Sequence, residues 1–363
     1  MKKLIISSDT LRPALKKLGQ AINTSSVLPI AKNIYCKVGK NEVELITTNL
    51  ELTISYKLAC ETGKDEPYEM LIPFDYFNQV IGVIKNAPIV IEHPSARKLK
   101  IVCEEDTFET ALEKIDDFPQ LPAHPKKAMI VLEENFAGLL TTALHTCAKD
   151  DTRPAMERAL FDINNGQSFI VSTDAHVMYR HSIKVTAEEP KQIQFTPKMI
   201  RAIEGMEKAE LSWNTKNVCI KNEKIAVWGR QFDDKYPDYK VIIPSYGPTL
   251  ILEKAMLVDA LHKAMISSGA TNKTTMVLNK EKGAILFETE DIDNSRNNHV
   301  KIAGEYTGTV ESIAFSAKKM LTVIDQVECE KIRLHIHSPA KAILISTEED
   351  ADHLGLIMPI KDK

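Results

Sequence analysis

Apolar and polar positions follow the same pattern three times along the chain. In each copy, a run of apolar residues typical of a strand leads into residues that are apolar at helical spacing. In the first copy these helical positions include Leu11, Leu15 and Leu18. The three segments are residues 3–22, 129–148 and 250–268. The pattern predicts a strand followed by an amphipathic helix in each of them.

A second strand–helix segment follows in each copy, at residues 70–84, 193–206 and 313–327. The separation along the chain between the first and the second segment is nearly equal in the three copies. Asp75, Thr196 and Ser316 are candidate N-caps of the second helices, with Pro197 at a first helical position. Three matched pairs of segments in the same order indicate an internal threefold repeat.

Proline-containing segments mark the ends of the first two copies, "DDFPQLP" at residues 116–122 and "KYPDYKVIIP" at residues 235–244. They predict three domains, at residues 1–125, 126–249 and 250–363. Each domain has two helices among many strands, and two helices cannot cover both faces of such sheets. We therefore predict an α+β fold with the helices on one face and with sheets that continue from copy to copy.

The composition is that of a globular protein with more than one domain. The 363 residues are 44% hydrophobic and 26% charged. No apolar run approaches the ~18 residues of a membrane span, and the start of the chain lacks the apolar run of a secretory leader. The six cysteines are scattered without a C-x-x-C motif, which favours reduced thiols over disulfides or a zinc site. We expect a cytoplasmic protein that needs no metal or other cofactor.

The stretch "STDAHVM" at residues 172–178 places Asp174 two positions before His176, between two predicted strands. A catalytic interpretation makes His176 a general base oriented by Asp174, but the chain has no nucleophile elbow, P-loop or dinucleotide motif. A metal interpretation fails on ligand spacing, because His335 and His337 share a strand face without a suitable third ligand. A third interpretation is a turn that forms one wall of an apolar groove.

Five stretches of this chain resemble the bacterial sliding clamps, the beta subunits of replicative DNA polymerase III. They are residues 27–54, 116–122, 159–179 ("ALFDINNGQSFIVSTDAHVMY"), 235–244 and 356–361 ("LIMPIK"). The resemblance covers the whole chain and implies a head-to-tail homodimer of three similar domains per subunit. Such a ring has helices lining a central hole and sheets outside. It would encircle duplex DNA without sequence preference and give processivity to the polymerase, as a non-catalytic, nucleoid-associated protein.

The resemblance also assigns roles to individual residues. Short peptides of the polymerase, the clamp loader and other partners would bind a groove formed by Met156, Thr173, Ala175, His176, Val177, Met178, Pro237, Ile242, Leu356, Met358, Pro359 and Ile360. The candidates for facing DNA are Arg12, Lys16, Lys17, Lys198, Arg201 and Lys318, with Lys319 beside them. The subunit interface would contain Phe108 and Thr110 of the first domain, and Ile266 and Ser267 of the third. In the groove, Asp174 is expected to stabilise the turn through local backbone contacts.

The charge distribution fits this role. The net charge of −4 is not that of a general DNA-binding protein. The six predicted helical segments are nevertheless net positive and the remainder net negative, so a mildly basic lining would attract DNA without holding it tightly. Some positions depart from the family pattern: Ala175 stands where many relatives have Gly, and Ala155 and Lys319 replace aromatic residues. The polar Thr110 and Ser267 predict a dimer that dissociates more readily than those of relatives.

Two other functions remain compatible with the residues taken without the resemblance. One is an enzyme of nucleic-acid metabolism that uses Asp174 and His176. The other is a repeat scaffold that binds proteins and does not encircle DNA.

Overall fold

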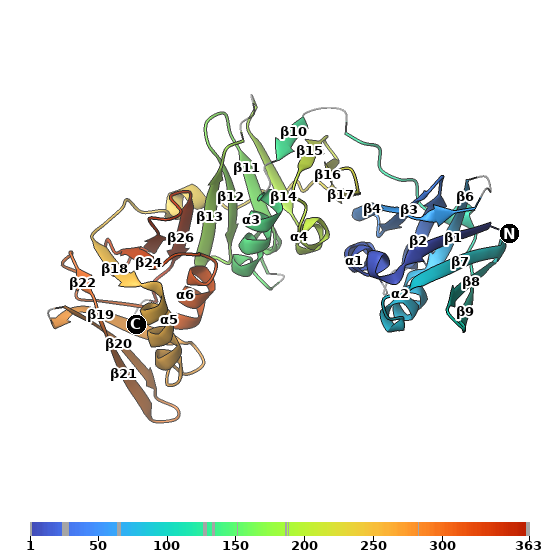
Figure 1. Cartoon of the computed structure of the whole chain (residues 1–363). Helices are drawn as coiled ribbons and strands as arrows, with labels where there is room; N and C mark the ends of the chain where they lie inside the picture. The colour runs from blue at the N-terminus through green and yellow to red at the C-terminus, as the bar shows by residue number, and fades with distance from the viewer. Residues whose placement is uncertain are drawn as a thin grey trace. The chain divides into compact units, whose positions relative to one another are not determined.

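The computed structural model describes residues 2–23, 29–63, 67–125, 129–132, 135–150, 152–185, 187, 189–281 and 283–360. The same order of elements occurs three times along these residues (Figure 1). Each copy has a strand, a helix and three strands, then a strand, a helix and three more strands, with a short extra strand in the first and third copies. The predicted threefold repeat and α+β class are therefore confirmed.

Two helices belong to each copy, as predicted. They are α1 (Ser8–Leu18) and α2 (Phe74–Val83), α3 (Phe136–Ala143) and α4 (Pro197–Ile203), and α5 (Lys254–Met265) and α6 (Ala317–Ile324). Helix α4 begins at the proline that the sequence predicted as its first residue. Helix α2 begins one residue before Asp75, so this carboxylate lies in the first turn and Pro73 is the N-cap residue. Ser316 is the N-cap residue of α6, although its side chain makes no capping hydrogen bond.

Backbone contacts divide the chain into two compact units. The first contains residues 1–138 and 197–232, and the second contains residues 139–196 and 233–363. The middle copy of the repeat is shared between them, because its strands join two different sheets. In Figure 1 these strands run from β10 to β17.

The first unit has two antiparallel sheets. The five-stranded sheet has the order β5 (Glu61–Thr62), β1 (Lys2–Ser7), β7 (Pro88–Ser95), β8 (Lys98–Cys103) and β9 (Asp106–Ala111). The eight-stranded sheet has the order β10 (Met129–Leu132), β15 (Ala209–Trp213), β16 (Asn217–Lys221), β17 (Ile225–Arg230), β4 (Leu52–Ala59), β3 (Glu42–Thr48), β2 (Asn33–Val38) and β6 (Tyr68–Pro73). Pairing of β17 with β4 joins the second copy to the first.

The second unit repeats this arrangement. Its nine-stranded sheet has the order β14 (Lys191–Phe195), β11 (Ala159–Ile163), β12 (Ser168–Thr173), β13 (Val177–Ile183), β26 (His353–Ile357), β25 (Ile343–Ser346), β24 (Lys331–His335), β18 (Thr249–Glu253) and β22 (Glu305–Tyr306). Its four-stranded sheet has the order β21 (Arg296–Ala303), β20 (Ala284–Asp291), β19 (Lys273–Glu281) and β23 (Ser312–Ser316). Pairing of β13 with β26 joins the second copy to the third, as the prediction of continuous sheets requires.

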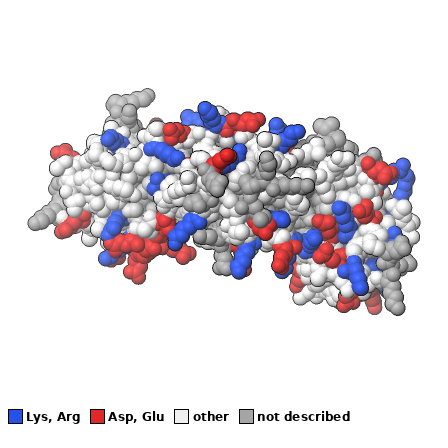
Figure 2. All heavy atoms as spheres, turned by 90° about the horizontal axis from the view of Figure 1, so that it is seen from above, with Lys and Arg blue, Asp and Glu red and all other residues white. Residues whose placement is uncertain are grey.

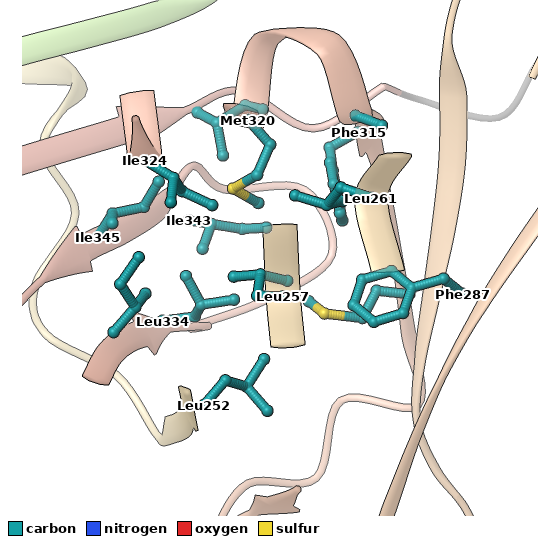
Figure 3. Packing of buried hydrophobic residues seen from close by; sticks show 14 of the residues in the cluster. Leu252, Leu257, Leu261, Phe287, Phe315, Met320, Ile324, Leu334, Ile343 and Ile345 are labelled. Carbon is teal, nitrogen blue, oxygen red and sulfur yellow. The ribbon is translucent and has the colours of Figure 1, made fainter. Parts of the chain in front are cut away.

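An apolar core of the second unit lies between α5, α6 and the two sheets (Figure 3). Leu261 of α5 and Met320 of α6 meet Phe287 and Phe315 of the four-stranded sheet, while Leu334 comes from the nine-stranded sheet. These side chains are fully buried. The 3.6-residue spacing seen in the sequence therefore marks the helix faces that hold the two sheets together.

A buried histidine lies where β26 joins β13. The ring of His353 lies tilted against that of Tyr179, with centroids 5.3 Å apart, and its Nε2 has no hydrogen-bond partner among the described residues. Burial lowers the pKa of His353 to about 4, although the nearby Asp350 acts in the opposite direction and His181 lowers it further. Asp350 also pairs with His181 at 3.3 Å. The native state therefore holds His353 neutral.

This histidine makes stability depend on pH. Between about pH 6.5 and 4, the unfolded chain binds a proton at His353 that the folded chain does not, so stability falls as the pH is lowered through this range. A shift of this size corresponds to about 3 kcal/mol at the acid end. Urea unfolding followed by circular dichroism should show a shallower pH dependence for His353→Gln. The exposed His262 supplies the control, because His262→Gln should keep the wild-type slope.

Candidate functional site

The stretch that contains Asp174 and His176 forms a tight turn between β12 and β13. Asp174 Oδ1 accepts hydrogen bonds from the backbone amides of His176 and Val177, both at 2.8 Å. Thr173 Oγ1 accepts one from the amide of Ala175 at 3.0 Å and donates to the carbonyl of Val177 at 2.6 Å. Ala175 has a φ of +73°, in the left-handed region. The expected local role of Asp174 is confirmed.

The first copy of the repeat contains an equivalent turn between β3 and β4. Asn49 Oδ1 accepts from the amides of Glu51 and Leu52 at 3.1 and 2.8 Å, and Thr48 Oγ1 accepts from the amide of Leu50 at 3.2 Å. Leu50 has a φ of +75° and is 62% exposed. The turn is therefore a conformation of the repeat itself, which argues for a structural role of its Asp or Asn.

The pairing of β13 with β26 brings the C-terminal segment to the turn. Val177, the first residue of β13, lies opposite Ile357, the last residue of β26. The amide of Met358 then donates to the carbonyl of His176 at 2.7 Å, and the amide of Ile360 donates to the carbonyl of Ala314 at 2.7 Å. Two predicted parts of the groove, far apart in sequence, are thus held together by backbone hydrogen bonds.

A third part of the predicted groove is anchored through Asp162 of β11. The short 3₁₀ helix η6 (Tyr239–Ile242) follows Pro237, and Tyr239 donates its hydroxyl to Asp162 at 2.7 Å. Lys240 lies 3.1 Å from the same carboxylate. Burial acts to raise the pKa of Asp162, but hydrogen bonds from Tyr239, Lys240 and Gln192 outweigh it and the pKa is lowered. This carboxylate stays charged and fixes η6 on the sheet.

An apolar cluster of the second unit unites these segments. It includes Met178, Leu356, Tyr236 and Tyr239, with Met358 and Ala155 packed against it from partly exposed positions. Ala155 belongs to the 3₁₀ helix η5 (Pro154–Glu157), which also carries Met156. The structure therefore brings together the four segments that the sequence assigned to one groove.

The predicted groove residues divide into two layers. Thr173, Val177, Met178 and Leu356 are buried. Residues with accessible side chains are Met156, Ala175, His176, Pro237, Ile242, Met358, Pro359 and Ile360. A ligand at this surface would touch the second group, whereas the first group supports it from within.

The geometry gives no support to catalysis by Asp174 and His176. One carboxylate oxygen of Asp174 binds backbone amides, and the other pairs with Lys319 of α6. Neither oxygen contact involves the imidazole of His176. No group of three or more potential metal ligands occurs among the described residues. None of the described helices is both long and apolar enough to cross a membrane.

The basic residues predicted to face DNA differ in their surroundings. Lys16, Lys198, Arg201 and Lys318 are exposed on their helices. Arg12 pairs with Asp9 and also donates to the carbonyl of Ile84. Lys17 donates to the carbonyl of Ala202 at 3.1 Å and to that of Glu204, at the end of α4. Through these hydrogen bonds, Lys17 contributes to the contact between α1 and α4. Its burial there lowers its pKa.

Of the residues predicted at the subunit interface, two lie on an edge strand and two follow helix α5. Phe108 and Thr110 are on β9, an edge strand of the five-stranded sheet, where both side chains are partly exposed on one face. Ile266 is exposed just after α5, whereas Ser267 is buried. Both the strand edge and Ile266 are available to a partner subunit.

Comparisons with known proteins assign this architecture to a family. The model for the N-terminal domain of the DNA polymerase III beta subunit matches residues 2–122, and the model for its C-terminal domain matches residues 240–361. The chain belongs to the DNA polymerase III beta subunit family. The chain is similar to the beta sliding clamp of Rickettsia felis, with 21% identity over 99% of this chain and 100% of the relative. It is also similar to that of Bacillus subtilis, with 19% identity over 99% of both chains.

Solved structures of beta subunits share the fold. The DNA polymerase III subunit beta of Pseudomonas aeruginosa superposes with a TM-score of 0.89 at 17% identity, covering 99% of this chain and 100% of that one. A sliding clamp from the same species bound to griselimycin gives a TM-score of 0.90 at 18% identity and the same coverage. The beta subunit of Thermotoga maritima gives 0.89 at 15% identity, with full coverage of both chains.

Some contacts in the site were not apparent from the sequence. The ion pair between Asp174 and Lys319 joins residues 145 positions apart, and the bond between Tyr239 and Asp162 joins residues 77 positions apart. No local spacing encodes either contact. The exposed Leu50, in contrast, could have been found by aligning "TTNLEL" with "STDAHV" within the repeat.

Residues with a left-handed backbone conformation predict how glycine and alanine substitutions change the stability of the fold. A non-glycine residue in this region costs about 1–2 kcal/mol, so Ala175→Gly and Leu50→Gly should each stabilise the fold by up to about 1 kcal/mol after the entropy of glycine is counted. Gly205 has a φ of +72°, and a Cβ added there would meet no other atom within 4 Å. Gly205→Ala should therefore destabilise by about 1 kcal/mol. Urea midpoints of the three variants measure this, and a loss of stability in both glycine variants would contradict it.

Proposed function

We propose that this chain is a DNA sliding clamp, a homodimeric ring that encircles duplex DNA and tethers the replicative polymerase and other partners. The observation that carries the proposal is the threefold repeat, in which neighbouring copies share continuous sheets and each copy has two helices. The similarity to beta sliding clamps along the whole chain supports it. In this role the protein is a non-catalytic subunit of the polymerase holoenzyme. It acts in the cytoplasm, where we place it on the nucleoid.

The chain is divided into clamp domains at residues 1–125, 126–249 and 250–363. The family models support the first and third domains, because they match residues 2–122 and 240–361. The second domain contributes β10 and β15–β17 to the sheet of the first, and β11–β14 to the sheet of the third. Residues 126–128, at the first boundary, lie outside the described residues.

Sheet edges support closure of the ring by two subunits. β9 and β21 are edge strands, and an edge strand presents backbone donors and acceptors to another chain. β9 carries the exposed acids Asp106 and Glu109, whereas β21 carries the exposed basic residues Arg296 and Lys301. Opposite charges favour pairing of the two edges head to tail, with Phe108 and Ile266 as apolar contacts.

Contact with DNA would be weak and independent of sequence. The proposed DNA-facing residues are Arg12, Lys16, Lys17, Lys198, Arg201 and Lys318, of which Arg12 and Lys17 also make internal contacts. Figure 2, seen from above the view of Figure 1, shows basic and acidic side chains interspersed on one face of the molecule. The six proposed DNA-facing residues are spread over three helices, so they would attract phosphates without forming the dense basic patch of a protein that grips DNA.

The groove is the proposed docking site for short apolar peptides of the polymerase, the clamp loader and other partners. It comprises Met156, Thr173, Ala175, His176, Val177, Met178, Pro237, Ile242, Leu356, Met358, Pro359 and Ile360. Flexible methionines at its surface suit several related ligands. A structural neighbour, the sliding clamp of Pseudomonas aeruginosa, was solved with griselimycin bound.

Topological retention on DNA is the test of the ring. After loading by an ATP-driven clamp loader, the protein should stay on nicked circular DNA at a salt concentration that removes it from linear duplex, because a ring leaves only through a free end. Light scattering should give about twice the 40.7 kDa mass of the chain. Phe108→Ala should shift the mass toward the monomer and abolish retention. Equal retention on linear and circular DNA would show that enclosure is the wrong mechanism.

Peptide binding is the test of the groove. Removal of residues 358–363 leaves β26 intact but deletes Met358 and Ile360, and should abolish binding of a labelled Gln-, Leu- and Phe-containing peptide. Met358→Ala should weaken binding by about 1–3 kcal/mol, as truncation of an interface anchor does. Fluorescence anisotropy measures the affinity. Ile292→Ala removes an equally apolar but distant, exposed side chain and should change nothing. Unchanged affinity after the deletion would place the docking site elsewhere.

A further inference from the structure

The turn at the groove is tied to a helix of the next copy of the repeat. Lys319, on the first turn of α6, pairs with Asp174 Oδ2. The two side chains are 35% and 20% exposed, so the pair is only partly screened by water. The same carboxylate uses Oδ1 to hold the amides of His176 and Val177. One side chain therefore links α6 to the backbone of the turn.

Comparison of the two equivalent turns shows that this link is specific to the groove. The first-copy turn has Asn49 in place of Asp174 and makes the same backbone hydrogen bonds with a neutral amide. The third residue of α4, equivalent to Lys319 in α6, is Met199, which is buried against Gly229. A turn of this kind can thus form without a carboxylate or a lysine, so the ion pair adds a restraint that the first-copy turn lacks. Both charges occur together at the copy of the turn that lies beside the C-terminal segment.

The surroundings of Lys319 contain other charged groups. Asp150 has its pKa lowered chiefly by a hydrogen bond from Thr152, with smaller contributions from Arg153 and Lys319. Lys318 is exposed on the same helix. Lys319 therefore has two acids near it, and of these Asp174 is the one in direct contact.

We propose that Lys319 is a positioning residue for the peptide site, acting through Asp174. By fixing the carboxylate, the ion pair holds the turn in the conformation in which the carbonyl of His176 bonds to Met358. Ala175 is in a strained left-handed conformation, so the turn gains from an external restraint. A turn that already has its bound conformation loses less conformational entropy when the peptide binds. This role rests on the proposed function of the groove.

A double-mutant cycle tests the role with the full-length dimer and the labelled peptide. Lys319→Met and Asp174→Asn should each weaken binding by roughly threefold to tenfold, the range of a partly buried, charge-assisted contact. The double variant should be no weaker than either single one, because both remove the same ion pair. Lys319→Arg should restore most of the affinity. Additive losses would mean that Lys319 contacts the peptide directly, which overturns the proposal.

A second measurement follows the turn without a ligand. Amide hydrogen exchange at His176 and Val177 should speed up in Lys319→Met but not in Lys318→Met, which removes the neighbouring exposed charge. Unchanged exchange in Lys319→Met overturns the positioning role whatever the peptide does. Peptide binding that is normal in the wild type and in Lys319→Met overturns this role alone. A wild-type chain that binds no peptide overturns the proposed groove function together with it.

Discussion

Backbone pairing between neighbouring copies of the repeat is the constraint on which the rest of the structure depends. A strand at the end of one copy leaves a row of donors and acceptors that must be satisfied, and here the next copy supplies the partners. β17 pairs with β4 in the first unit, and β13 pairs with β26 in the second. The repeat therefore grows by extending sheets, and the helices cover the apolar faces that this leaves.

The same pairing brings together two segments of the proposed groove. Because β13 and β26 are antiparallel, the start of one lies beside the end of the other, and the turn before β13 meets the segment after β26. The first unit has an equivalent junction, where the backbone amide of Arg230, the last residue of β17, donates at 3.0 Å to the carbonyl of Glu51, just before β4. The second junction differs in its side chains, with methionines, prolines and the ion pair of Lys319 in place of arginine, leucine and asparagine. The two junctions therefore share a backbone geometry but present different side chains at the surface.

The weak basic charge of the helices is consistent with the proposed ring around DNA. A ring that must slide cannot bind phosphates tightly, and the basic residues of the helices are few and partly used within the chain, as Arg12 and Lys17 show. Holding on to DNA then depends on closure between subunits. Binding partners depends on an apolar surface, which is supported by a buried cluster and by the charged anchor at Asp162.

The sequence by itself determined the threefold repeat, the positions of the helices and the local role of Asp174. Apolar periodicity and Asx turns depend only on residues that are close together in the sequence. It also predicted the segments of the proposed groove, through their resemblance to a family. Only the tertiary structure decided which groove residues are accessible, since strand pairing buries Val177, Met178 and Leu356 while leaving His176 and Met358 at the surface. The partners of Lys17 and Lys319 were also undetermined by sequence. A long flexible side chain reaches acceptors that only the packing of distant segments brings near.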